Sequence, residues 1–177
     1  MDFALAELQG HKRAFIVTDR TMTQIGVTDR IGKILEKNGM TYQVFDAVKP
    51  DPDLTTIGLI LEQVKRFEPD VFVSLGGGSP MEAAKIGWLL YEQPDLAFED
   101  IAMRFMDIRK RFVDFPHLGQ KAKMVAIPTT SGTGSEVTPF TVITDVKTNQ
   151  KYPITDSSIL PNMAIVDPYF ALSSPEV

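Results

Sequence analysis

The chain has 177 residues, of which 44% are hydrophobic and 23% are charged, and its formal net charge is -5. This size and balance suit one globular domain with a substantial core, and the acidic excess disfavours broad binding to a nucleic-acid backbone. Cysteine is absent, which excludes a disulfide framework and a thiolate metal site. The sequence shows neither a signal-peptide pattern nor an apolar run of the ~20 residues that a membrane span needs, so we expect a soluble, cytoplasmic protein.

Segments with strand-like and helix-like patterns alternate along the chain. Short apolar runs predict buried strands at 14–18, 41–45, 71–75, 123–127 and 163–166. Apolar residues at helical spacing predict helices from Val27 to the Asn38-Gly39 stop, from a cap at Asp53 to Glu68, and from Met81 past Tyr91. This alternation indicates crossover units and a parallel sheet, and the fold class is therefore α/β. A hairpin is expected from 137–145 and 151–154.

Three glycines, Gly76, Gly77 and Gly78, separate the central strand from the helix that follows it. Glycine permits a sharp turn and lets another molecule approach without meeting a Cβ atom. With Ser79 as the cap and Pro80 in the first turn, the free N–H groups of the helix start would point at one place and attract phosphate. The alternative is a tight structural turn with nothing bound, which the entropic cost of three consecutive glycines disfavours.

Two more polar segments follow strands of the same predicted sheet. The loop 129–136 is rich in hydroxyl side chains: Thr129, Thr130, Ser131, Thr133 and Ser135. Since the carboxyl ends of parallel strands meet at one edge, we expect this loop and Asp19 to face the glycine turn. Asp19 could accept hydrogen bonds from both ribose hydroxyls and so favour NAD over NADP, although Arg20 could tolerate a 2′-phosphate. The alternatives are a helix cap for Asp19 and a self-satisfied polar turn for the loop.

The region 92–123 predicts a charged helix. Its basic residues Arg104, Arg109, Lys110 and Arg111 alternate with Phe105, Phe112 and Phe115. Such alternation could serve base stacking on single-stranded nucleic acid, but an amphipathic helix with a solvated face is the favoured interpretation, and a subunit contact is the next. The final residues, 173–177, resemble the cap and first turn of another helix.

Other catalytic signatures are missing from the sequence. Ser135 does not stand in a G-x-S-x-G pattern, and the glycine turn has neither G-x-G-x-x-G nor P-loop spacing. The two histidines, His11 and His117, are interpreted as surface residues. No catalytic residue and no metal ligand is therefore assigned.

Two long motifs resemble the iron-containing (group III) alcohol dehydrogenases. They are Gly76-Gly77-Gly78-Ser79-Pro80 with Ala84-Lys85, and the run from Pro128 to Thr138. The segments 104–111 and 121–124 resemble in particular the alcohol dehydrogenase half of the bifunctional acetaldehyde/alcohol dehydrogenases. The similarity extends from about His11 to the end of the chain.

The resemblance implies that residues 1–177 form a Rossmann-like NAD-binding α/β domain. Its implied cofactor contacts are Gly77, Gly78 and Ser79 at the pyrophosphate, Asp19 at the adenosine ribose, Asp51 near the adenine, and Thr129, Thr130, Thr138 and Lys151 further along, with Lys151 by the nicotinamide ribose. Glu82 is a further implied cofactor contact, at a position where the family usually has Asp. Phe140 stands where the family lines its substrate pocket, and the alternative for it is an apolar core residue.

The resemblance also implies Fe²⁺ or Zn²⁺, held in the family by one Asp and three His on a helical C-terminal domain. The first two ligands follow a G-x-D-x-x-x-H pattern, which this sequence lacks. We therefore expect the cofactor-binding part of a longer, homo-oligomeric enzyme that reduces acetaldehyde or a similar small aldehyde, with this chain inactive alone. The resemblance also implies a strand and a turn before the first crossover unit, which the start of this sequence lacks.

Two alternatives stay open. One is the cofactor domain of a glycerol dehydrogenase or dehydroquinate synthase relative, which the segment 104–111 disfavours. The other is a non-catalytic nucleotide-binding or assembly module, which the missing metal ligands favour for the chain as given. Neither nucleic acid nor a membrane is an expected partner.

Overall fold

The computed structural model describes residues 1–96, 117–146, 148, 150–170 and 172. At its centre is a five-stranded sheet in the order β2-β1-β3-β4-β7, in which every neighbouring pair is parallel. The strands are β1 (Arg13–Val17), β2 (Thr41–Phe45), β3 (Val71–Gly76), β4 (Lys123–Pro128) and β7 (Met163–Ala164). The α/β prediction is confirmed, and the last strand is two residues shorter than the sequence predicts.

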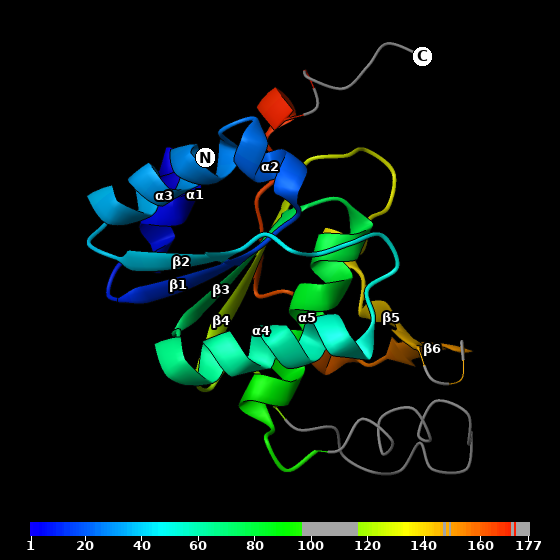
Figure 1. Cartoon of the computed structure of the whole chain (residues 1–177). Helices are drawn as coiled ribbons and strands as arrows, with labels where there is room; N and C mark the ends of the chain where they lie inside the picture. Colours follow the sequence, from blue (N-terminus) through cyan, green and yellow to red (C-terminus); the bar gives the residue numbers. More distant parts are fainter. Residues whose placement is uncertain (97–116, 147, 149, 171, 173–177) are drawn as a thin grey trace.

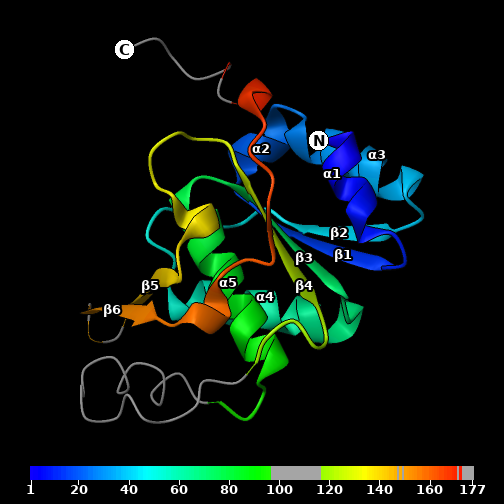
Figure 2. The same cartoon turned by 180° about the vertical axis from the view of Figure 1, so that it is seen from behind.

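Helices cover both faces of the sheet (Figures 1 and 2). One face carries α1 (Asp2–Leu5) and α3 (Val27–Lys37), with α2 (Arg20–Gln24) beside them, and the other carries α4 (Leu54–Phe67) and α5 (Gly78–Glu92). Side chains along each strand point alternately to the two faces. Phe15 and Phe72 thus join the core under α4 and α5, while Ile16 and Val73 join the core under α3.

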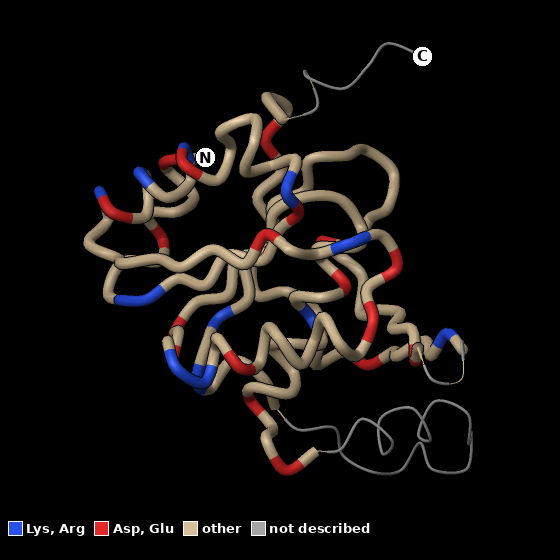
Figure 3. The backbone as a smooth tube through the Cα atoms, viewed as in Figure 1, with Lys and Arg blue, Asp and Glu red and all other residues tan. Residues whose placement is uncertain are grey.

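Short 3₁₀ segments complete the described chain: η1 (Ala6–Leu8), η3 (Ser135–Val137), η4 (Ser157–Ile159) and η5 (Pro168–Phe170). Acidic and basic residues are interspersed along the tube in Figure 3. Among the described residues, none of the helices has the length and apolar character that crossing a bilayer requires.

The start of α5 differs from the prediction. The helix begins at Gly78 and Gly77 is its N-cap, so Ser79 lies inside the first turn and does not cap. The physical reason is that the extended backbone of Gly77 leads straight into helical geometry, which leaves no separate capping residue between turn and helix.

Gly87 on α5 lies against the neighbouring helix α4. A Cβ atom added to Gly87 would lie 2.8 Å from Cγ2 of Ile60 on α4, and 3.9 Å from Phe72 on the sheet. Glycine at this position therefore permits a close crossing of α4 and α5.

The predicted hairpin is present as a separate two-stranded sheet, β5 (Phe140–Asp145) and β6 (Gln150–Thr155). Its first strand starts later than expected because Val137 belongs to η3. The backbone N–H of Thr144 donates to the carbonyl of Pro52 at 3.1 Å, which ties the hairpin to the start of α4. The helix expected over 92–123 falls largely on residues 97–116, which lie outside the described residues, as do 173–177.

Candidate functional site

The glycine turn lies at the carboxyl end of β3, where α5 begins. Gly76 has a φ of 141°, and a Cβ atom there would lie 2.8 Å from Cγ of Pro80. An L-residue is thus excluded both by backbone geometry and by space. The fifteen-residue α5 starts immediately afterwards without a side-chain cap hydrogen bond. Its first N–H groups are therefore available to an anion that binds at the helix start.

The hydroxyl loop lies directly beside this turn, as predicted. The backbone N–H of Thr129 donates to the carbonyl of Gly76 at 3.0 Å. A Cβ atom on Gly77 would lie 3.2 Å from Oγ1 of Thr130, and one on Gly78 would lie 3.6 Å from Cγ2 of Thr133. The absence of a side chain at Gly77 therefore leaves room for the side chain of Thr130, while Gly78 and Thr133 are at ordinary contact distance.

Asp19 follows β1 at the same edge of the sheet. Its Oδ1 atom accepts hydrogen bonds from the backbone N–H groups of Thr21 (2.8 Å) and Met22 (3.3 Å), so the residue caps α2. Its Oδ2 atom lies 3.5 Å from the position that a Cβ atom would take on Gly76. The helix-cap alternative is thus confirmed for one carboxylate oxygen, and the other oxygen is directed towards the glycine turn. The ribose contact stays a prediction.

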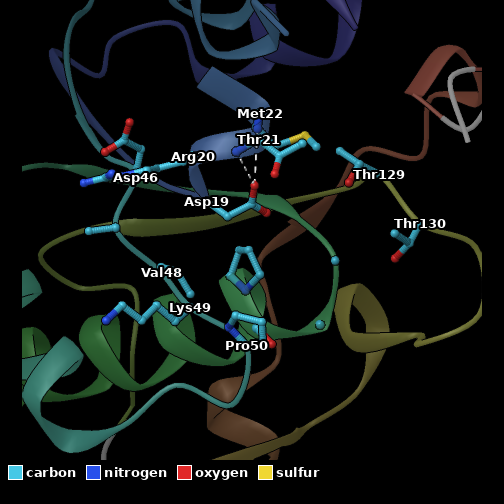
Figure 4. A pocket seen from close by; sticks show the side chains of 15 residues that line it. Asp19, Arg20, Thr21, Met22, Asp46, Val48, Lys49, Pro50, Thr129 and Thr130 are labelled. Carbon is cyan, nitrogen blue, oxygen red and sulfur yellow. Dashed lines mark hydrogen bonds between the residues drawn. The ribbon is translucent and has the colours of Figure 1, made fainter. Parts of the chain in front are cut away.

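These segments surround a cleft of about 820 Å³ (Figure 4). It is lined by residues 19–22 at the start of α2, 46–50 after β2, 77–80 at the glycine turn, and Thr129 and Thr130 after β4. Figure 4 shows Arg20 and Asp46 on one side of Asp19 and the two threonines on the other. Of the predicted cofactor contacts, six line this cleft: Asp19, Gly77, Gly78, Ser79, Thr129 and Thr130.

The other four predicted contacts, Asp51, Glu82, Thr138 and Lys151, are not among the residues that line the cleft. Nζ of Lys151 lies 2.7 Å from Oδ1 of Asp51, so two residues that the resemblance assigns to different parts of the cofactor contact each other. Asp51 also has a left-handed backbone, with φ at 54°. Burial, followed by repulsion from Asp51, raises the pKa of Glu82, whereas Lys85 and Lys151 act to lower it. Whether these four contact a cofactor stays a prediction.

Lys85 is part of a motif that the sequence analysis names, but the sequence analysis assigns it no role of its own. Its side chain is 0% exposed, and its Nζ atom donates to the carbonyls of Thr138 at 2.6 Å and Phe140 at 2.9 Å. Burial lowers the pKa of Lys85 to about 8, against the opposing effect of Glu82 and Glu136. The signal in the sequence is a lysine within an apolar stretch of the helix, between Ala84 and Ile86.

Phe140 is 40% exposed and therefore not a core residue, which leaves its substrate-pocket role as the open prediction. His117 is exposed, as predicted. Nδ1 of His11 lies 3.8 Å from Oδ2 of Asp70, just before β3 and so at the opposite edge of the sheet from the cleft. Among the described residues, no three His, Asp or Glu side chains gather into a group that could hold a metal ion, so none of them is assigned to iron.

A parallel sheet with a glycine turn, a helix start and an acidic residue around one cleft at its carboxyl edge is the arrangement typical of nucleotide-binding α/β domains. The family model described as iron-containing alcohol dehydrogenase matches residues 3–168. The chain belongs to this family.

Known relatives agree with this assignment. The chain is 54% identical over 166 residues to the aldehyde-alcohol dehydrogenase of Streptococcus pneumoniae, covering 93% of this chain and 19% of the relative. It is 40% identical to the NADPH-dependent butanol dehydrogenase of Clostridium saccharobutylicum, covering 97% of this chain and 42% of that protein. The chain thus spans about a fifth of the first relative's length and less than half of the second's.

Solved structures give the same result. The iron-containing alcohol dehydrogenase of Thermococcus thioreducens superposes with a TM-score of 0.87 at 31% identity, over 97% of this chain and 45% of that one. Sulfoacetaldehyde reductase from Bifidobacterium kashiwanohense, solved in complex with NAD⁺, gives a TM-score of 0.80 at 29% identity, over 97% of this chain and 42% of that one.

Proposed function

We propose that this chain is the NAD(H)-binding part of an iron-dependent alcohol dehydrogenase that reduces a small aldehyde such as acetaldehyde to a primary alcohol. The single observation that carries the proposal is the glycine turn, where no side chain fits at Gly76 and the start of α5, which has no side-chain cap hydrogen bond, faces the cleft. Dinucleotide pyrophosphates bind at such helix starts because the free N–H groups and the helix dipole both favour negative charge.

The residues around the cleft fit an NAD molecule. In the proposal, Gly77, Gly78 and Ser79 hold the pyrophosphate, Thr129 and Thr130 donate hydroxyl hydrogen bonds to it, and Asp19 accepts from the adenosine ribose. The NAD⁺ complex of the sulfoacetaldehyde reductase supports a dinucleotide on this fold. Asp51, Glu82, Thr138 and Lys151 would serve the remainder of the cofactor, beyond the cleft.

NAD rather than NADP is the proposed cofactor because the Oδ2 atom of Asp19 faces the cleft with a negative charge, which repels a 2′-phosphate. Arg20 and Lys49 also line the cleft and weaken this repulsion. The relative named as an NADPH-dependent butanol dehydrogenase indicates that the preference differs within the family.

The metal belongs to the complete enzyme in this proposal, as iron or zinc on ligands outside the described residues. A bound metal of this kind polarises the alcohol oxygen. The contribution of this chain is to bind the nicotinamide cofactor and orient it for hydride transfer. We extend the proposal to a cytoplasmic homo-oligomer in which this chain alone does not turn over substrate.

A titration of the purified chain with NADH, with NADPH in parallel, tests the proposal. Trp88 is the only tryptophan and is buried on α5, with its ring N–H donating to the carbonyl of Ala122 at 2.8 Å. Energy transfer from Trp88 to reduced nicotinamide therefore reports binding. We expect saturable binding that is tighter for NADH, and no alcohol oxidation with Fe²⁺ or Zn²⁺ added. A cooperatively folded chain that binds neither nucleotide would overturn the proposal and favour an assembly module.

A further inference from the structure

Lys85 is a buried cation that the proposed cofactor contacts do not explain. It lies in the middle of α5, where its neighbours Ala84 and Ile86 are also fully buried. Removing an ammonium group from water is costly, and an apolar side chain would fill the same space at lower cost. The hydrogen-bond partners of Lys85 should therefore explain why a lysine is buried at this position.

Both of its acceptors belong to one short segment. Thr138 and Phe140 flank Pro139, and the segment connects η3, the end of the hydroxyl loop, to β5. Pro139 has no N–H group to donate, and its carbonyl accepts from the backbone N–H of Asp156, just after β6, at 3.1 Å. A second contact, from the hydroxyl of Thr141 to the carbonyl of Glu82 at 3.2 Å, joins the same two elements.

This attachment joins the two halves of the proposed site. The glycine turn lies at the start of α5. The segment 138–140 runs into β5, the first strand of the hairpin, in which Thr144 pairs with Lys151 of β6. The cleft at the glycine turn is lined by the residues proposed for the adenosine and the pyrophosphate, whereas Thr138 and Lys151 lie outside its lining. The place of the hairpin relative to α5 thus decides whether both groups of residues meet the same ligand.

We propose that Lys85 is a positioning residue for the nicotinamide half of the cofactor, because it holds the segment 138–140 at a fixed place relative to the glycine turn. The inference rests on the proposed NAD-binding function. It assigns Lys85 no contact with the cofactor itself. Its loss should weaken ligands that extend to the hairpin and leave ligands that end at the pyrophosphate almost unaffected.

The charge of Lys85 gives this role a pH dependence. Burial lowers its pKa to about 8, while Glu82 on α5 and Glu136 on η3 oppose that shift, and Asp51 and Lys151 act on Glu82 in turn. Below pH 8 the ammonium makes charge-assisted hydrogen bonds to the two carbonyls, and above it the neutral amine makes weaker ones. The preference for NADH over ADP should therefore fall as the pH rises from 7.5 to 9.

The test measures the affinities of NADH and ADP for the 177-residue chain, for Lys85→Met and for Glu92→Gln. ADP ends at the pyrophosphate, and its terminal phosphate keeps one charge state over this pH range because its second pKa is near 6. Glu92 is a matched control on the same helix, since its buried carboxylate accepts from Lys121 N and Ala122 N, away from the cleft. We expect Lys85→Met to lose tenfold or more in NADH affinity and less than threefold in ADP affinity, whereas Glu92→Gln lowers the melting temperature with both affinities retained.

The outcomes separate the inference from the proposed function. A wild-type chain that binds neither NADH nor ADP overturns the proposed function and this inference with it. If the wild-type chain binds both, equal effects of Lys85→Met on the two ligands overturn the inference alone. Should Lys85→Met fail to fold, the wild-type pH profile decides, and an NADH-to-ADP preference that stays constant between pH 7.5 and 9 counts against Lys85.

Discussion

At the residue scale, the carboxylate of Asp19 has one oxygen in a structural role and a second oxygen directed towards the proposed site. Its Oδ1 atom is occupied by the N–H groups of Thr21 and Met22, while Oδ2 is directed towards Gly76. From the sequence, the cap and the ribose contact are alternatives, but the geometry makes them compatible. The cap holds the side chain in one orientation with Oδ2 towards the glycine turn, so a ligand bound by this oxygen would cost less side-chain entropy.

Replacing Asp19 separates the two roles. Asparagine is as good a helix cap as aspartate, so Asp19→Asn should retain stability while it loses the negative charge. Hydrogen bonds to a charged group contribute about 1.5–3 kcal/mol, so we expect the NADH-to-NADPH affinity ratio to fall by roughly tenfold or more. Parallel titrations with the two nucleotides give this ratio.

Asp19→Ala should lose the same cofactor preference and in addition about 1 kcal/mol of stability, because the cap is gone. Asp53→Ala is the matched control, since Asp53 caps α4 by accepting from Thr56 N at 2.7 Å and does not line the cleft. It should lose stability with an unchanged preference. An Asp19→Asn chain with the wild-type ratio would contradict the ribose role.

At the element scale, the crossing of α4 and α5 fixes the place of the helix that begins at the glycine turn. The crossing is close because Gly87 presents no Cβ atom to Ile60, whose Cγ2 would be only 2.8 Å away. Ile60 is branched at Cβ, so this methyl group has little freedom to move aside. The same pair of helices contains Gly58, which is exposed on α4 with no atom within 4 Å of an added Cβ.

Replacing each of these two glycines with alanine should change the free energy of unfolding in opposite directions. Gly58→Ala gains helix propensity without a steric cost and should raise the free energy of unfolding by about 0.5–1 kcal/mol. In Gly87→Ala, overpacking at about 1–3 kcal/mol exceeds that gain, and a net loss of about 1 kcal/mol is expected. Urea unfolding of both variants measures the difference. A gain of stability in both variants would mean that α4 and α5 can separate at no cost.

At the scale of the whole molecule, the sequence predicted the sheet and the cleft better than the hairpin side of the site. Apolar runs such as Ala14–Val17 and motifs next to strand ends are local signals, so their meeting at one edge follows from the parallel topology alone. The contact between Asp51 and Lys151 and the burial of Lys85 depend on where the hairpin packs. No local periodicity encodes that placement, and the resemblance implied residue roles without it.

The start of α5 is another case that local rules decide incorrectly. Ser79 followed by Pro80 has the composition of a cap and a first turn, yet Gly77 caps the helix. Capping preferences rank residues by their side chains. At Gly77 the backbone is extended, as a capping position requires. The side chain of Thr130 occupies the space where a Cβ atom of residue 77 would lie, so a glycine takes this position.

The residues of the proposed site come from positions as far apart as Asp19 and Lys151, so a ligand that contacts them binds only the folded chain. Such a ligand stabilises the fold by about 2.7 kcal/mol when its concentration is 100 times the dissociation constant. In a domain of this size, 1 kcal/mol shifts the melting temperature by about 2–4 °C, so saturating NADH should raise it by roughly 5–11 °C. The Gly58→Ala substitution lies outside the cleft, and its own increment should add to that of NADH. Thermal melts of both chains with and without NADH measure the four values. A melting temperature that does not move at saturating NADH would show that the nucleotide has no preference for the folded state, and the cleft would then need a different ligand.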